Sequence, residues 1–151
     1  MNRDRLSLLS LLVLPVLYFA LTLVLRENGG PFWIWHIVDP SYAYLVDALN
    51  LINLRWAQNI YHPGTTVTAL AALIIKAAHP FSGGGDIARI VLAEPEWHLR
   101  LISTVFIAMN TAALGLVGVV GYRVFRNPIL ALTFQTAPFL SMVILKNSYH
   151  V

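Results

Sequence analysis

The sequence predicts an all-α, polytopic membrane protein with about three transmembrane helices and amphipathic juxtamembrane helices in one large external loop. Two observations predict this class. Hydrophobic residues make up 58% of the 151 residues and charged residues only 11%, whereas a soluble domain carries about 25% charged residues. Uncharged runs of roughly 17 to 21 residues also recur along the chain, and a helix of that length crosses a bilayer. A lipid bilayer is therefore an expected partner.

Charge and cysteine content exclude several other classes. The formal net charge is +3 and the sequence has no cysteine, so disulfide frameworks, cysteine zinc sites and thiol nucleophiles are excluded. The ten basic residues form no Lys/Arg run, and we expect no nucleic-acid partner because such partners need a concentrated basic surface.

The first expected span covers residues 6–25, LSLLSLLVLPVLYFALTLVL, which contain no charged side chain. At helical rise this segment extends about 30 Å, the thickness of the hydrocarbon core. It is longer than the roughly 7–15 apolar residues of a signal peptide, so we interpret it as an uncleaved helix. Pro15 predicts a kink within it.

Two further spans are expected, at residues 101–121 and 128–145. The first of these is uncharged and has glycines at every third position from 115 to 121, which lets helix backbones approach closely in lipid. The second lies at the short end of the spanning range.

Residues 65–81 are apolar but contain Lys76 and His79. The uncharged run 67–75 covers only about 13 Å at helical rise, less than half a bilayer. We therefore expect this segment to form a helix at the membrane surface, with the Lys76 stem against lipid and its ammonium in water.

Basic residues set the expected orientation. If 65–81 does not cross, the basic loop after the second span joins the N-terminal arginines on one side, and the positive-inside rule makes that side cytoplasmic; these residues are Arg3, Arg5, Arg123 and Arg126. The chain is then a single multi-pass membrane domain, 1–151, of the inner (plasma) membrane. Its N-terminus is cytoplasmic and residues 26–100 form a large external, periplasmic loop.

Two other helices are expected within this loop. Asp39 and Pro40 suit the cap and first turn of a helix, whose apolar stripe follows at i, i+3, i+4 and i+7, namely Leu45, Ala48, Leu49 and Ile52. Asp47 lies off this stripe, so we expect its carboxylate to face water. Asp86 is expected to cap a short helix over 87–93.

Three segments together resemble a known family: DPSYAYLVDALNLIN, YHPGTTVTALAALIIK and HLRLISTVFIAMNTAALGLVGVVGYRVFRN. An acidic residue opening a surface helix, a His-Pro break, a second surface helix and an arginine heading the next span resemble the membrane glycosyltransferases of the GT-C class. The resemblance is greatest to the protein-mannosyltransferase and aminoarabinose-transferase-like branch. The chain departs from the family's His-Pro-Pro and Arg-Leu-Pro patterns, since it has His-Pro-Gly and Arg-Leu-Ile.

The resemblance implies an enzyme that transfers a sugar from a polyprenyl-phosphate donor to an acceptor on the external face. Family members have many more spans and several hundred residues. We therefore expect the chain to be the N-terminal part of a longer protein, a fragment inactive by itself.

The resemblance also implies roles for individual residues. Asp39 is the candidate catalytic residue, as a base or as a ligand of a divalent metal whose involvement stays open; the alternative is a plain helix cap. Three cationic or imidazole side chains are candidates for the donor phosphate, namely His62, Arg100 and Lys146, and each is also a normal surface or span-end residue. Tyr42 is the candidate substrate-binding residue.

A non-catalytic small membrane protein is the alternative function, either an assembly subunit or part of a transporter. In that class, the polar residues of the external loop would only contact water and cap helices.

Overall fold

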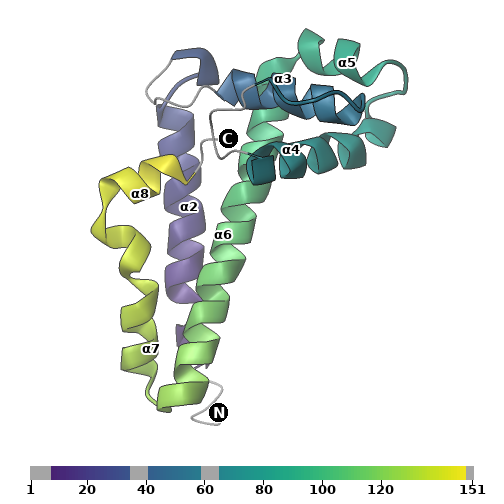
Figure 1. The fold of residues 1–151 in the computed structure, drawn as a ribbon. Coiled ribbons are helices and arrows are strands. Elements are labelled where there is room, and N and C mark those ends of the chain that lie inside the picture. The colour runs from purple at the N-terminus through teal and green to yellow at the C-terminus, as the bar shows by residue number, and fades with distance from the viewer. Residues whose placement is uncertain (1–7, 35–40, 59–64, 149–151) are drawn as a thin grey trace. The chain divides into compact units, whose positions relative to one another are not determined.

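The computed structural model describes residues 8–34, 41–58 and 65–148, and within these ranges every regular element is a helix. The all-α prediction is therefore confirmed. The chain divides into two compact units, each described by itself below. The described residues within 1–29 and 106–149 form the first, here called the long-helix unit. The described residues within 30–105 form the second, the short-helix unit. Helix α6 (Pro95–Phe125; Figure 1) contributes residues to both units.

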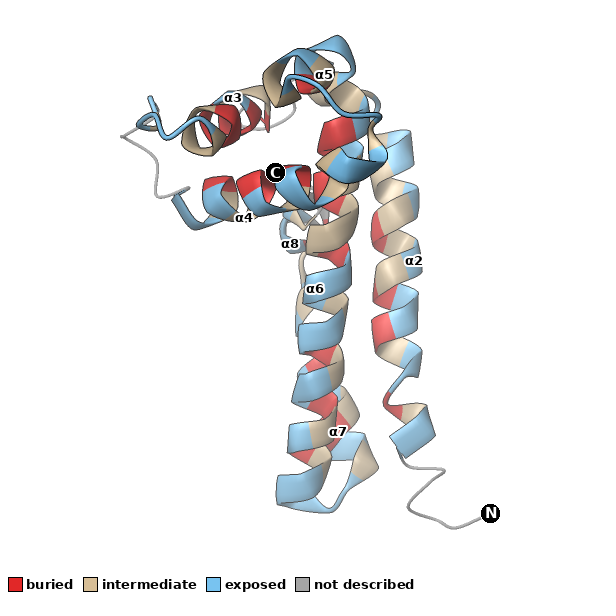
Figure 2. Cartoon of the chain, turned by 90° about the vertical axis from the view of Figure 1, so that its right-hand side faces the viewer, coloured by how far each residue is buried: buried red, intermediate tan, exposed pale blue. Residues whose placement is uncertain are grey.

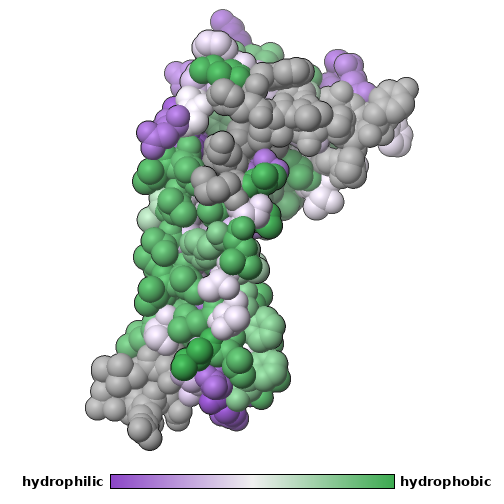
Figure 3. Space-filling model, turned by 90° about the vertical axis from the view of Figure 1, so that its left-hand side faces the viewer, coloured by the Kyte–Doolittle hydropathy of each residue, from purple (hydrophilic) through white to green (hydrophobic). Residues whose placement is uncertain are grey.

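Two helices are long and apolar enough to cross a membrane. They cover Leu8–Asn28, 21 residues, and Pro95–Phe125, 31 residues, or about 32 and 46 Å at helical rise. In the long-helix unit, large hydrophobic side chains are exposed along both helices, including Leu9, Val13, Val16, Leu116, Val120 and Val124. Figure 3 shows one face of this unit covered by hydrophobic residues. Such exposed apolar surface is normal in lipid and unfavourable in water. These two helices indicate a membrane protein.

The first long helix is interrupted just before Pro15. A turn at residues 11–12 precedes α2 (Val13–Asn28), because Pro15 has no N–H for the carbonyl four residues earlier and its ring clashes there. The Gln135 side chain compensates: its Nε2 donates to the Leu11 carbonyl at 3.0 Å and to the Leu114 carbonyl at 2.9 Å. Gly118 makes room for this amide, since a Cβ there would lie 2.6 Å from Gln135 Cδ.

The expected third span, residues 128–145, is not one helix, and this prediction was wrong in that respect. It consists of α7 (Pro128–Gln135), a 3-10 turn η3 (Ala137–Leu140) and α8 (Met142–Asn147). Pro138 in the 3-10 turn cannot continue the α7 hydrogen-bond pattern. The Ser141 side chain then accepts from the Ile144 N–H and caps α8 as a new helix. At eight residues, α7 extends only about 12 Å.

The core of the long-helix unit joins α2, α6 and α8. Tyr18, Leu114 and Leu145 are buried together there. Phe139 packs against them, with its ring edge-to-face to Tyr18 at a centroid distance of 6.1 Å. The broken C-terminal segment is thus packed against both long helices within this unit.

The short-helix unit contains η1 (Phe32–Ile34), α3 (Ser41–Ile52), α4 (Thr65–Ala78), η2 (His79–Phe81) and α5 (Ile87–Ala93). Helices α3 and α4 pack against each other, and Figure 2 shows buried positions along both. Their buried apolar residues are Tyr44, Leu45, Ala48 and Leu49 on α3 and Ala71, Ala72 and Ile75 on α4. The expected apolar stripe of α3 is confirmed at three of its four positions, and Ile52 is only half-buried.

Two predicted helices of the loop are confirmed as helices. The helix expected within 65–81 is α4, which ends at Ala78 and is followed by η2; its place at a membrane surface stays a prediction. The helix expected over 87–93 is α5, and Oδ1 of Asp86 accepts from the Ala88 N–H at 3.3 Å. Asp86 therefore caps α5 as its sequence position indicates.

Candidate functional site

The structure describes three of the five candidate site residues, Tyr42, Arg100 and Lys146. Asp39 and His62 lie outside the described residues, so their convergence with Arg100 stays a prediction. Tyr42 lies in the first turn of α3, and Arg100 lies near the start of α6 with an exposed side chain. Lys146 lies in α8, in the long-helix unit.

Glu96 forms a polar contact that joins three elements of the short-helix unit. Its Oε1 accepts a hydrogen bond from the Tyr42 hydroxyl at 2.7 Å, and its Oε2 accepts one from the Phe32 N–H at 3.2 Å. The carboxylate therefore ties η1 and α3 to the first turn of α6. Sequence reasoning did not single out Glu96. An acidic residue directly after a helix-opening proline is the only local signal, and it indicates helix stabilisation rather than a distant partner.

Tyr42 has a raised pKa because of this environment. Burial raises it first, the hydrogen bond to Glu96 adds to this, and the negative charge of Glu96 adds further, so that the pKa of Tyr42 is about 12 instead of 10.0. The Tyr42 hydroxyl keeps its proton and donates a hydrogen bond to Glu96. Its oxygen lone pairs are what a ligand could still use, because a hydroxyl both donates and accepts.

Replacing Glu96 with glutamine is expected to lower the pKa of Tyr42 from about 12 towards 10.0, because the charge of Glu96 is lost. The ultraviolet absorbance of phenolate against pH measures this, and Tyr42→Phe identifies which titration step belongs to Tyr42. The raised pKa also means that folding stability falls as the pH rises from 10.0 towards 12, since the unfolded chain releases this proton first. An unchanged titration curve in Glu96→Gln would show that the hydrogen bond is not formed.

Asp47 was expected to face water, and this prediction was wrong. Asp47 is buried, with 2% of its surface exposed. Its Oδ1 accepts a hydrogen bond from the Gln58 N–H at 2.8 Å. The carboxylate thus satisfies a backbone donor of the segment that follows α3, which a helix-face pattern cannot reveal. Nearby, Nδ2 of Asn50 is buried and has no hydrogen-bond partner among the described residues.

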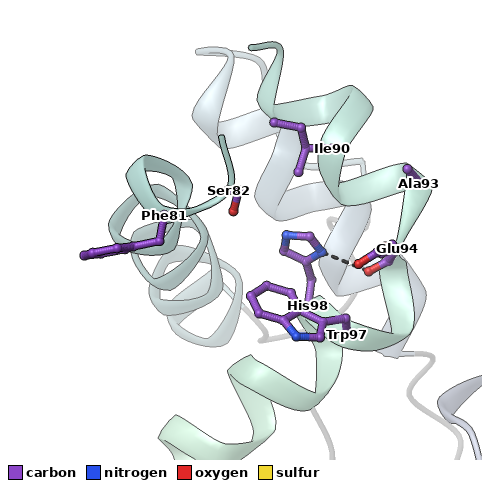
Figure 4. Close-up of a pocket in the computed structure, with 7 residues that line it drawn as sticks. All are labelled: Phe81, Ser82, Ile90, Ala93, Glu94, Trp97 and His98. Carbon is purple, nitrogen blue, oxygen red and sulfur yellow. Dashed lines mark hydrogen bonds between the residues drawn. The ribbon is translucent and has the colours of Figure 1, made fainter. Parts of the chain in front are cut away.

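A pocket of about 380 Å³ lies between η2, α5 and the start of α6 (Figure 4). Its size is at the lower end of small-molecule sites. Aromatic, apolar and polar groups share its wall, which is formed by Phe81, Ser82, Ile90, Ala93, Glu94, Trp97 and His98.

His98 is the most buried polar residue of this pocket, at 4% exposure. Its Nδ1 lies 2.9 Å from the Glu94 carbonyl, as the dashed line in Figure 4 marks. A carbonyl only accepts, so Nδ1 donates, and in the neutral ring Nε2 is then an acceptor. The Trp97 ring lies edge-to-face to the imidazole at a centroid distance of 4.7 Å. The sequence interpretation gave His98 no special role, because burial at the first turns of a helix has no local sequence signal.

Metal binding has no support within the described ranges, which contain no group of three or more His, Cys, Asp or Glu residues able to hold a metal ion. Asp39 and His62 are not among the residues on which this finding rests.

Comparison of the chain with protein-family models, with curated proteins and with solved structures finds no match.

Proposed function

We propose that the chain is the N-terminal part of an integral-membrane glycosyltransferase that transfers a sugar from a polyprenyl-phosphate donor to an acceptor on the external face. The observation that carries the proposal is the order of the helices. In the described residues, one long apolar helix is followed by the short helices α3, α4 and α5 and then by a second long apolar helix. The resemblance of the sequence to the GT-C class rests on a long span, two surface helices and the next span, and α3 and α4 take the places of the two surface helices.

The short helices favour a loop on one side of the membrane. Helix α3 has 12 residues and α4 has 14, which correspond to about 18 and 21 Å, less than the roughly 30 Å hydrocarbon core. Helix α4 also carries Lys76 in its last turn. We propose that residues 26–100 lie outside the plasma membrane and that the N-terminus and the basic loop after α6 lie in the cytoplasm.

The proposed chemistry divides between a base and cations. Asp39 would deprotonate the acceptor or hold a metal. Arg100 and His62 would stabilise the negative charge of the leaving phosphate, and the same role for Lys146 stays a prediction. Tyr42 would accept a hydrogen bond from substrate through its hydroxyl oxygen, because its O–H already donates to Glu96.

A transfer assay tests this function. Membranes of cells that carry the intact gene are supplied with a labelled polyprenyl-phosphate sugar, and membranes of cells without the gene are the control. The proposal predicts gene-dependent transfer of label from the lipid to an acceptor. Equal transfer in both membranes would favour the non-catalytic membrane protein instead.

A further inference from the structure

The segment directly after α3 presents two large apolar side chains to the surroundings. Leu54 is 96% exposed and Trp56 is 93% exposed, and Arg55 between them is exposed as well. We call Leu54, Arg55 and Trp56 the α3 tip. Tryptophan usually buries most of its ring and gives its N–H a partner, so an almost fully exposed ring is unusual.

The backbone holds the α3 tip in a fixed conformation. The Leu54 N–H donates to the Leu51 carbonyl at 3.0 Å, and the Arg55 N–H donates to the Asn50 carbonyl at 2.8 Å. This pair of bonds ends a helix around one left-handed residue, which is usually glycine. Here that residue is Leu54, with φ 56°, and a leucine pays an energetic cost there that glycine does not.

No contact within the described part of the chain offsets the backbone cost or covers the exposed side chain, since the Leu54 side chain is not packed. Both would be offset if the Leu54 side chain entered an apolar phase. We propose that the α3 tip inserts into a phospholipid bilayer, with Leu54 and Trp56 at the level of the headgroups and upper acyl chains. Arg55 then lies beside the lipid phosphates.

Lipid fits the α3 tip better than a protein surface does. A stable protein interface takes about 800 Å² and some 20–30 residues from each partner, which three residues cannot supply. Lipid insertion has no such threshold, because its strength scales with the apolar area buried and with the attraction of basic groups to anionic lipids. Tryptophan is enriched at the membrane–water interface, and arginine suits anionic headgroups. A bilayer is also the expected surroundings of this chain, because two of its helices are long and apolar enough to cross one.

Quenching of tryptophan fluorescence by brominated lipid tests the insertion. The whole chain is reconstituted into vesicles of phosphatidylcholine and phosphatidylglycerol, with and without bromine on the acyl chains. The emission of Trp56 is the difference between the parent and Trp56→Phe. We expect this difference to fall at least about twofold in brominated vesicles, because a ring at the interface touches the acyl chains. Emission of Trp56 that brominated lipid leaves unchanged would overturn the proposal, whether acrylamide in water quenches it or a protein surface shields it.

Leu54→Gly separates insertion from folding. Glycine is favoured at a left-handed position, so this variant should fold at least as well as the parent, as circular dichroism during thermal unfolding reports. Bromine quenching of Trp56 should nevertheless weaken, because one of the two inserted side chains is gone. Leu73→Ala, which removes an exposed leucine from α4, should leave that quenching unchanged. Equal quenching of Trp56 in the parent and in Leu54→Gly would contradict a role for Leu54 in anchoring.

Discussion

Asp39→Asn is expected to lower sugar transfer at least about 100-fold while the protein stays folded, because a general base contributes roughly that factor or more. Asparagine is about as good a helix cap as aspartate, so the capping role expected for Asp39 would be kept and only the negative charge is removed. The rate of transfer from a labelled polyprenyl-phosphate sugar measures the loss, and thermal unfolding of the purified protein checks the fold.

Asp86→Asn is the matched control for this prediction. Asp86 is an acidic helix cap in the short-helix unit, and it is exposed. The same loss of charge at this cap should leave the transfer rate near that of the parent. Full transfer activity in Asp39→Asn would end the catalytic assignment and leave Asp39 as a helix cap.

Gln135→Leu is expected to lower the free energy of unfolding by about 2 kcal/mol, because it leaves a buried carbonyl without a donor. Gln135 is fully buried, and Pro15 cannot supply the N–H that the Leu11 carbonyl lacks. Leucine is similar in size, so no cavity contributes to the loss. Because leucine also removes Gln135 Oε1, which is buried without a partner among the described residues, the loss is a lower limit for the Nε2 hydrogen bonds. Unfolding of the protein in mixed micelles against denaturing detergent measures the change.

A second substitution tests the cause of that loss. Pro15→Ala supplies an N–H for the Leu11 carbonyl, so Gln135→Leu should cost much less in the Pro15→Ala background than in the parent. An equal cost of Gln135→Leu in both backgrounds would show that Gln135 does not compensate for the proline.

Local sequence patterns predicted the helices but not their long-range contacts. The cap at Asp86 and the short apolar run of α4 depend on neighbouring residues, and both are found. The break in 128–145 was missed because hydropathy outweighed Pro138, although proline is the local signal of such a break. The contact between Tyr42 and Glu96 joins residues 54 positions apart, and no period or motif encodes a pairing at that distance.

The candidate site was predictable only as a set of residue types. A capping aspartate, a loop histidine and an arginine at the head of a span are visible in the sequence, but their distances from one another are set by packing. Glu96 and His98 could not be selected from the sequence, because their hydrogen-bond partners become visible only in the fold.

The most direct test of the account is the sidedness of two cysteines, because every proposed role requires the short helices to lie outside the membrane. The sequence has no cysteine, so Leu92→Cys in α5 and Asn127→Cys in the basic loop after α6 can each be labelled alone; both positions are exposed. In intact cells, a membrane-impermeant thiol reagent should label the cysteine at position 92 and should leave the one at position 127 unlabelled until the cells are opened. Labelling at position 127 with protection at position 92 would show that α4 crosses the membrane and would contradict the account.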